Sequence, residues 1–188
     1  MEHKYILILG AGRSSSSLIN YLLQQADQNN WTITVGDISE PSARERVAGF
    51  TSGRSIEFNM EDRERSRKAI QASDIVISLL PAQLHPLAAA ICLEERKHFF
   101  TASYVSDEMR SFNAEAKAKG LLFLNECGLD PGIDHMSGMQ VIDKIRTAGG
   151  VLTSFESFTG GLIAPDTDPE NPWRYKFTWN PRNVVMAG

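Results

Sequence analysis

Residues 5–23 constrain the fold of this chain more than any other segment. An apolar run at residues 5–9 leads into a Gly-Ala-Gly turn at residues 10–12, and apolar residues at helical spacing follow between residues 18 and 23. A strand, a glycine turn and a helix in this order aim the backbone N–H groups of a helix start at a diphosphate. The pattern therefore predicts a dinucleotide-binding turn. The residues expected to line it are Gly10, Ala11, Gly12, Arg13, Ser14 and Ser15.

The two glycines have different roles in such a turn. Gly10 permits the sharp bend at the end of the strand, and Gly12 lets the backbone approach the phosphates. Ser15 occupies the third small position, where glycine or alanine is usual. An ordinary structural turn also carries two glycines, but the N-terminal strand and an acidic residue downstream favour cofactor binding.

The acidic residue is Asp37, which ends a second apolar run at residues 31–36. A carboxylate about 20 residues past the glycines accepts hydrogen bonds from the ribose hydroxyls of NAD and repels the 2′-phosphate of NADP. Asp37, with the adjacent Ile38, is therefore expected to contact the cofactor and to favour NAD over NADP. Three nearby basic residues would reverse that preference by attracting the phosphate: Arg13, Arg44 and Arg46.

Strands and helices alternate along the first part of the chain. Apolar runs at residues 5–9, 31–36, 55–59, 74–80, 98–102 and 121–125 indicate six strands. Helical patterns follow the glycine turn and cover residues 61–72, 84–96 and 106–119, the last with Ser106 as its N-cap. This alternation predicts an α/β fold, a Rossmann-type doubly wound parallel sheet over residues 1–127.

The pattern changes after Asn125. Glycine and proline interrupt residues 128–132, a helix is expected over residues 133–148, and residues 151–159 alternate like a strand. These elements cannot close a domain by themselves. We therefore expect residues 128–188 to be the incomplete start of a second α/β domain, and the chain to be the N-terminal portion of a longer protein.

Composition narrows the classes of function. The formal net charge is −4 and there is no long basic run, which argues against nucleic-acid binding. The sequence has neither a bilayer-spanning apolar stretch nor a signal sequence, so we expect a cytoplasmic protein without a membrane partner. Cys92 and Cys127 lack metal-ligand spacing, so we expect free thiols, a buried Cys127 and no metal site.

Ligands of open parallel sheets bind beyond the carboxyl ends of the strands. Small and polar residues gather at these ends in the sequence. Ser78 and Leu79 end the fourth predicted strand, residues 101–104 end the fifth, and residues 125–135 follow the sixth. One edge of the sheet is therefore the expected binding site.

The motifs at this edge resemble those of the glutamate-forming saccharopine dehydrogenases, or saccharopine reductases. The matching segments are Ile-Ser-Leu-Leu-Pro at residues 77–81 with His85, Thr-Ala-Ser-Tyr at 101–104, Asn-Glu-Cys-Gly-Leu-Asp-Pro-Gly-Ile-Asp-His at 125–135, Gly-Gly-Leu-Ile-Ala-Pro at 160–165, and residues 175–182. The resemblance covers essentially the whole chain, and the run Gly-Leu-Asp-Pro-Gly-Ile-Asp-His is its most specific part.

The resemblance implies an enzyme of lysine metabolism. Such an enzyme interconverts saccharopine with aminoadipate semialdehyde and glutamate, by hydride transfer to or from NAD or NADP, and acts as a homodimer. Two alternatives stay open: an imine reductase of the carboxynorspermidine type, and a non-catalytic NAD(P)-binding module. The 188 residues alone are expected to be inactive because half of the substrate domain would be missing.

The resemblance also implies roles for individual residues. Besides the glycine turn, those implied to line the cofactor are Ser78, Leu79, Thr101, Ala102, Leu129, Asp130 and Pro131. Those implied to contact substrate are Ser103, Tyr104 and Asp130, and the expected anchors for its carboxylates are Arg174, Lys176 and Arg182. Asp130 and Tyr104 are the expected acid–base pair.

Some of these residues also have a purely structural interpretation. Asp130 precedes Pro131 and would equally serve as the N-cap of the following helix. We expect His85 and His135 to be structural rather than catalytic. Thr159 stands where the family often has a cysteine, which removes any role for a thiol at that position.

Overall fold

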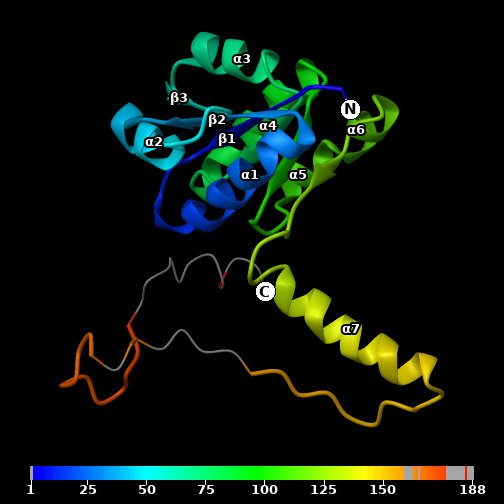
Figure 1. The fold of residues 1–188 in the computed structure, drawn as a ribbon. Coiled ribbons are helices and arrows are strands. Elements are labelled where there is room, and N and C mark those ends of the chain that lie inside the picture. The colour runs from blue at the N-terminus through cyan, green and yellow to red at the C-terminus, as the bar shows by residue number, and fades with distance from the viewer. Residues whose placement is uncertain (1, 159–162, 165, 177–184, 186–188) are drawn as a thin grey trace. The chain divides into compact units, whose positions relative to one another are not determined.

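The computed structural model describes residues 2–158, 163–164, 166–176 and 185. The chain divides into two compact units, Met1–Asp134 and His135–Gly188. Figure 1 shows the first as a layered body of helices and strands, and the second as a long helix followed by irregular chain. The domain boundary expected from the sequence, between residues 127 and 128, stays a prediction.

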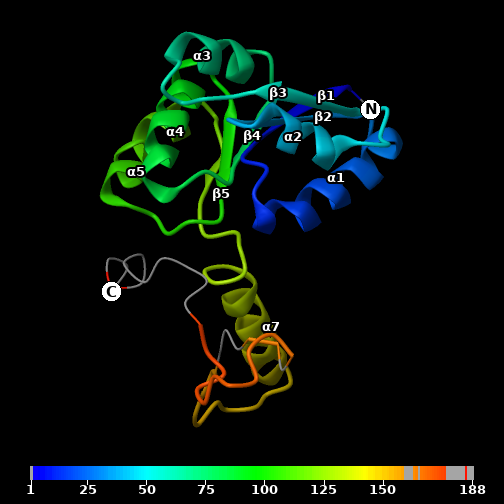
Figure 2. The same ribbon diagram turned by 90° about the vertical axis from the view of Figure 1, so that its left-hand side faces the viewer.

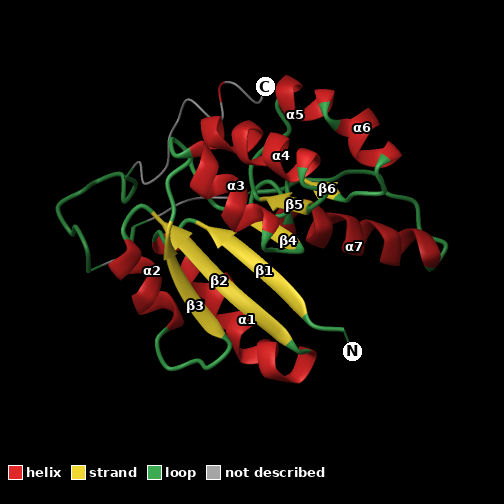
Figure 3. Cartoon of the chain, turned by 90° about the horizontal axis from the view of Figure 1, so that it is seen from above, coloured by secondary structure: helices red, strands yellow, loops and turns green. Residues whose placement is uncertain are grey.

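Within the described residues, six parallel strands form one sheet in the order β3-β2-β1-β4-β5-β6 (Figure 3). Their bounds are β1 Lys4–Leu9, β2 Trp31–Asp37, β3 Gly53–Glu57, β4 Ile75–Ser78, β5 His98–Thr101 and β6 Phe123–Leu124. The order reverses between β1 and β4, which is the switch point of a doubly wound sheet. The predicted Rossmann-type fold is confirmed.

Helices cover both faces of this sheet (Figure 2). Those on one face are α1 Ser16–Asn29 and α2 Glu40–Val47, and those on the other are α3 Arg63–Gln71, α4 His85–Glu94 and α5 Asp107–Ser111. The short helix α6 Asn113–Ala118 follows α5, and two 3-10 turns, η1 Arg13–Ser15 and η2 Ala82–Leu84, precede α1 and α4.

Strand β1 shows why the strands are apolar throughout. Leu7 and Leu9 pack into the core cluster formed with α3, α4 and α5, whereas Ile6 and Ile8 pack into the cluster formed with α1 and α2. All four side chains are buried. A strand covered on both faces needs apolar residues at every position rather than at alternate ones.

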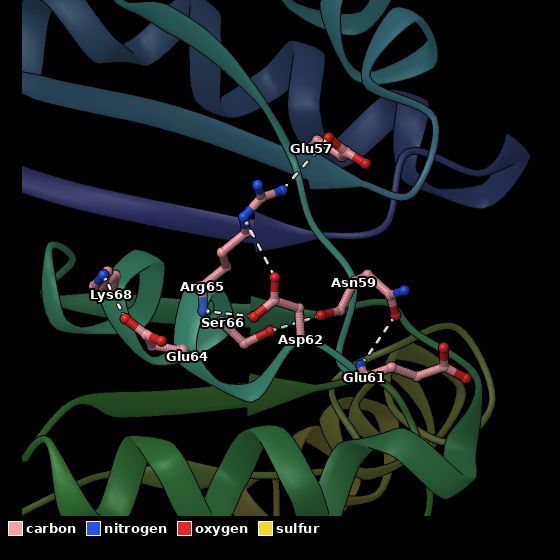
Figure 4. Close-up of polar contacts among 8 residues, drawn as sticks. All are labelled: Glu57, Asn59, Glu61, Asp62, Glu64, Arg65, Ser66 and Lys68. Atoms are coloured by element: carbon pink, nitrogen blue, oxygen red, sulfur yellow. Dashed lines mark hydrogen bonds and ion pairs between the residues drawn. The ribbon is translucent and has the colours of Figure 1, made fainter.

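Polar contacts build the turn between β3 and α3 (Figure 4). The carbonyl oxygen of Asn59 accepts hydrogen bonds from the Asp62 N–H (3.0 Å) and from the Ser66 hydroxyl (2.9 Å). Oδ1 of Asp62 accepts the N–H of Arg65 at 3.1 Å and caps α3. The start of this helix is therefore determined by its own first turn.

Two helical segments differ from the sequence prediction. Residues 106–119 form two helices instead of one, and Phe112 (φ −76°, ψ −13°), which lies between them, packs against the core cluster that contains Met109. Helix α2 was not predicted. It is short and buries only Ala43 and Val47, so its apolar periodicity is weak.

The second unit contains most of helix α7 Ile133–Thr147, close to the expected bounds of 133–148. The strand predicted over residues 151–159 is wrong for the part that the structure describes, since residues 151–158 are irregular. A strand needs a paired neighbour for its backbone groups, and no strand lies within the described part of His135–Gly188. Among the described helices, none is long and apolar enough to cross a membrane.

Candidate functional site

The glycine turn lies at the switch point between β1 and β4. The Gly10 N–H donates to the carbonyl of Gly36 at 2.7 Å, and the Leu79 N–H donates to the carbonyl of Leu9 at 2.8 Å. Gly10 has φ +106°, and a Cβ at this position would lie 3.0 Å from the carbonyl oxygen of Leu79. Both the backbone conformation and the close neighbour restrict this position to glycine.

Gly12 is under no such constraint from the fold. Its φ is −64°, and no described atom would lie within 4 Å of a Cβ at this position. Arg13 and Ser14 are exposed in η1, whereas Ser15 is buried and donates its hydroxyl to the carbonyl of Gly12 at 2.7 Å. Ser15, the third small residue of the predicted turn, is therefore buried, whereas the backbone of Gly12 faces open space.

The carboxylate of Asp37 braces this turn. Its Oδ2 accepts the Ala11 N–H at 2.7 Å, and its Oδ1 accepts the Ser39 N–H at 2.9 Å. Arg46 of α2 donates from Nε to the carbonyl of Ala11 (3.2 Å) and from its terminal nitrogen to that of Gly12 (3.4 Å). The carboxylate expected to bind ribose is already engaged with backbone, and a guanidinium lies beside the turn.

Ile38 and Arg44, the other residues expected near the cofactor after β2, lie on the surface. Ile38 is 72% exposed. Arg44 pairs with Glu40 at 2.6 Å on the surface of α2. The hydroxyl of Ser55, followed by Arg44, lowers the pKa of the Glu40 carboxyl, so Glu40 remains an anion that holds Arg44.

A buried histidine links the ends of β4 and β5. His85 is 3% exposed, with Nδ1 2.9 Å from Oγ of Ser78 and Nε2 2.8 Å from Oγ of Ser103. Oγ1 of Thr101 lies 3.2 Å from Nε2. Burial lowers the pKa of His85 to about 4, so the ring is neutral at pH 7. Ser78 and Thr101, both expected to line the cofactor, direct their hydroxyls at this ring.

Sequence reasoning left His85 out of the site because a lone histidine at a helix start carries no chemical signature. The available signal was its spacing. His85 is the first residue of the helix that follows Pro81, so its side chain lies close to Ser78 at the end of the preceding strand. Its contact with Ser103, 18 residues later, depends on the pairing of β4 with β5.

The two expected acid–base residues meet. The Tyr104 hydroxyl donates to Oδ1 of Asp130 at 3.2 Å. Partial desolvation, and then the charge of Asp130, raise the pKa of Tyr104, so the phenol keeps its proton at neutral pH. Both side chains are exposed at the carboxyl edge of the sheet.

The turn that carries Asp130 is held by its own backbone. The Gly128 N–H donates to the carbonyl of Pro131 at 2.9 Å, and the Ile133 N–H donates to the carbonyl of Gly128 at 2.9 Å. A Cβ on Gly128 would lie 2.8 Å from the Cβ of Ala102. This close packing fixes the turn against the end of β5.

The interpretation of Asp130 as a helix N-cap is wrong. Helix α7 begins at Ile133, and the carboxylate within its first turn is that of Asp134, whose Oδ1 accepts the Gly132 N–H at 2.9 Å. Of the other residues of this turn, Leu129 is 77% exposed and Pro131 is buried.

The expectation that Cys127 is buried is also wrong. Cys127 is exposed, whereas Cys92 is fully buried, and both thiols are free. Because β6 ends at Leu124, Cys127 lies in the loop beyond the sheet, where Sγ donates to the carbonyl of Thr101 at 3.2 Å. Within the part of the chain that the structure describes, no three His, Cys, Asp or Glu side chains are grouped as a metal site would require.

The expected carboxylate anchors belong to the second unit. Arg174 and Lys176 are exposed in an irregular segment, where the Ile163 N–H donates to the carbonyl of Arg174 at 3.1 Å. Arg182 and Thr159 lie outside the described residues, as does most of the Gly-Gly-Leu-Ile-Ala-Pro segment.

Two family models match the chain. The model described as the saccharopine dehydrogenase NADP binding domain matches residues 6–124. The model described as the saccharopine dehydrogenase C-terminal domain matches residues 128–188.

Relatives with known names match over nearly the whole chain. The chain is 35% identical to saccharopine dehydrogenase [NADP(+), L-glutamate-forming] of Schizosaccharomyces pombe, over 97% of this chain and 40% of that protein. It is 38% identical to alpha-aminoadipic semialdehyde synthase of Arabidopsis thaliana, over 97% of this chain and 19% of that protein. The solved apo saccharopine dehydrogenase (L-Glu forming) of Saccharomyces cerevisiae matches with a TM-score of 0.82 and 34% identity, over 98% of this chain and 40% of that one. The chain thus spans less than half the length of these proteins.

Proposed function

Because this chain belongs to the saccharopine dehydrogenase family, we propose that it is the cofactor-binding part of an oxidoreductase of lysine metabolism. The proposed reaction interconverts saccharopine with aminoadipate semialdehyde and glutamate. One observation in the structure carries the proposal. The Tyr104 hydroxyl and the Asp130 carboxylate meet at the carboxyl edge of the same sheet whose β1 leads into the open turn at Gly12. The relatives named above give no support to a polyamine-forming reductase or to a binding module without turnover.

The open turn fits a nicotinamide dinucleotide. The space that a Cβ on Gly12 would fill lets phosphate oxygens approach the backbone N–H groups. When bound, the nicotinamide ring accepts or supplies the hydride. Gly10, Leu79 and Ala11 belong to the same turn and its neighbouring strand end, and they keep their proposed roles as cofactor contacts.

We propose NADP rather than NAD as the cofactor. The comparisons do not support the preference for NAD that Asp37 suggested, since the matching model and the fungal relatives carry NADP in their names. The structure offers a physical reason. The carboxylate of Asp37 already accepts two backbone N–H groups. The Arg46 guanidinium contacts the glycine turn, and the exposed Arg13 directly follows that turn in sequence. These guanidinium groups would attract a 2′-phosphate.

Tyr104 and Asp130 supply the proton steps of the proposed reaction. Hydride transfer requires mainly placement of the reacting carbon, whereas imine formation and hydrolysis require an acid and a base. During hydrolysis, Asp130 accepts a proton from the water that attacks the imine carbon, and Tyr104 protonates the departing nitrogen. During condensation the two residues exchange these roles. Arg174 and Lys176 are proposed to bind the substrate carboxylates.

Turnover by the natural, full-length protein tests this function. Saccharopine with NADP⁺ or NAD⁺ should produce an absorbance rise at the reduced-nicotinamide band, with NADP⁺ the better cofactor. Aminoadipate semialdehyde with glutamate and NADPH should give the reverse change. Carboxynorspermidine serves as the comparison substrate. Cofactor binding without turnover of saccharopine, or faster turnover of the polyamine, would contradict the proposal.

A further inference from the structure

We propose that His85 is a positioning residue that holds the Ser103 hydroxyl as a hydrogen-bond donor toward the ligand at the carboxyl edge of the sheet. The ligand group would be an acceptor, such as a carbonyl or carboxylate oxygen of the cofactor or the substrate. The identity of that ligand rests on the proposed function. The tautomer of His85 and the direction of its hydrogen bond with Ser103 do not rest on that function, because they follow from contacts within the protein.

The contacts place the imidazole between two hydroxyls. Nδ1 faces Ser78 at 2.9 Å, and Nε2 faces Ser103 at 2.8 Å. Ser78 is 0% exposed at the end of β4, whereas Ser103 is only half-buried beyond the end of β5. The ring therefore connects a fully buried hydroxyl to one that reaches the surface.

The neutral ring has one N–H, and the environment selects which nitrogen carries it. If Nδ1 carried the proton, it would donate to Ser78, and the Ser78 O–H would have no acceptor among the described residues. Such a buried unpaired donor is costly. If Nε2 carries the proton, Ser78 donates to Nδ1 and Nε2 donates to Ser103. The buried Thr101 hydroxyl, 3.2 Å from Nε2, then has Nδ1 at 3.5 Å as its acceptor. The Ser103 O–H is then free to donate outward.

The backbone of Ser103 is fixed on both sides, which gives this donor a defined direction. Its N–H donates to Oγ1 of Thr101 at 3.3 Å, and its carbonyl accepts the N–H of Glu126 at 3.1 Å. The next residue is Tyr104, which contacts Asp130. A group bound by the Ser103 hydroxyl would therefore lie beside the Tyr104–Asp130 pair.

Amide replacements at position 85 test the direction of this hydrogen bond in the full-length enzyme. The amide nitrogen of His85→Gln can replace Nε2 and still donate to Ser103, whereas the shorter amide of His85→Asn reaches only toward Ser78. We expect kcat/KM to stay within about threefold of wild type for His85→Gln and to fall about tenfold for His85→Asn, the effect of one lost hydrogen bond. Equal losses in the two variants would overturn the proposal.

A double-mutant cycle separates positioning from general structural support. Ser103→Ala should lose about tenfold in kcat/KM, and adding His85→Asn to it should cost less than about twofold more. Losses that multiply would show that His85 does not act through Ser103, and the proposal would fail.

Nitrogen NMR of histidine-labelled full-length protein reads the tautomer without any turnover. The expected spectrum has a protonated Nε2 and an unprotonated Nδ1 for His85 at neutral pH, with the resonances assigned by their loss in His85→Gln. A protonated Nδ1 would overturn the proposal even in an active enzyme. If the protein gives the expected spectrum but does not turn over saccharopine, the proposed reaction is rejected and the role of His85 is supported.

Discussion

The hydroxyl of Tyr104 donates to Oδ1 of Asp130 at 3.2 Å, across 26 residues of sequence. Tyr104 lies beyond the end of β5, and Asp130 lies in the turn that follows β6. The pair joins a phenol that keeps its proton to a carboxylate, which is the combination that the proposed imine chemistry requires.

Removing either partner should impair turnover by the full-length protein. Tyr104→Phe and Asp130→Asn are each expected to lower kcat by about 100-fold, because general acid or base catalysis contributes at least that much. Steady-state kinetics measures the effect. Tyr21→Phe, on an exposed tyrosine of α1, is the matched control and should leave kcat unchanged. Full activity in Tyr104→Phe would exclude the phenol as the acid.

The two glycines of the turn should respond differently to alanine. Gly12→Ala is expected to weaken NADPH binding at least about tenfold while unfolding stability changes by less than about 0.5 kcal/mol, since the Cβ meets open space. Gly10→Ala should destabilise the fold by about 1–3 kcal/mol because of its positive φ and the nearby Leu79 carbonyl. Calorimetric titration and chemical denaturation measure the two effects. Unchanged affinity in a well-folded Gly12→Ala protein would mean that no phosphate approaches this backbone.

Stability should depend on pH through His85. Its pKa is about 4 in the folded protein and about 6.5 when unfolded, so the unfolded chain binds more protons between these values. The free energy of unfolding is therefore expected to fall as pH drops from 6.5 toward 4, by up to about 3 kcal/mol from this group. Denaturation of wild type and His85→Gln across that range measures the difference. The variant should lose less stability on acidification, and parallel curves would contradict the buried neutral ring.

The cap of α3 should contribute measurable stability. Asp62→Ala removes the acceptor of the Arg65 N–H and is expected to cost about 1 kcal/mol in the free energy of unfolding. Glu61→Ala, next to it and exposed, makes a matched control whose cost should be near zero. Thermal or urea unfolding compares the two, and similar values for both would argue against the cap.

The two thiols should differ in reactivity. Burial raises the pKa of the Cys92 thiol, and no part of this residue is exposed, so it should react with a thiol reagent only after unfolding. Cys127 should react in the native protein, slowly, because partial desolvation raises its pKa as well. Mass spectrometry of briefly labelled protein locates the adduct. Cys127→Ala should remove native labelling, whereas labelling of native Cys92 would contradict the core packing.

Much of the first unit could be read from local patterns. The apolar runs and the glycine turn predicted the sheet, and the family resemblance at the polar strand ends pointed to Tyr104 and Asp130, which the structure brings into contact. The failures occurred where local pattern was weak or a partner was needed. Helix α2 buries too few residues to show periodicity, and residues 151–158 have no described strand beside them.

The sequence by itself determined the α/β layout and the chemistry available at one edge of it, because strand and helix preference, glycine turns and strand ends depend on neighbouring residues. Only the tertiary structure decided that Asp37 braces the glycine turn, that Arg46 lies beside it, and that His85 joins Ser78 to Ser103. Apart from the contact between Ser78 and His85, which are seven residues apart, these contacts join segments far apart in sequence. They exist only after the parallel strands pair and the helices pack on them, so no local pattern encodes them.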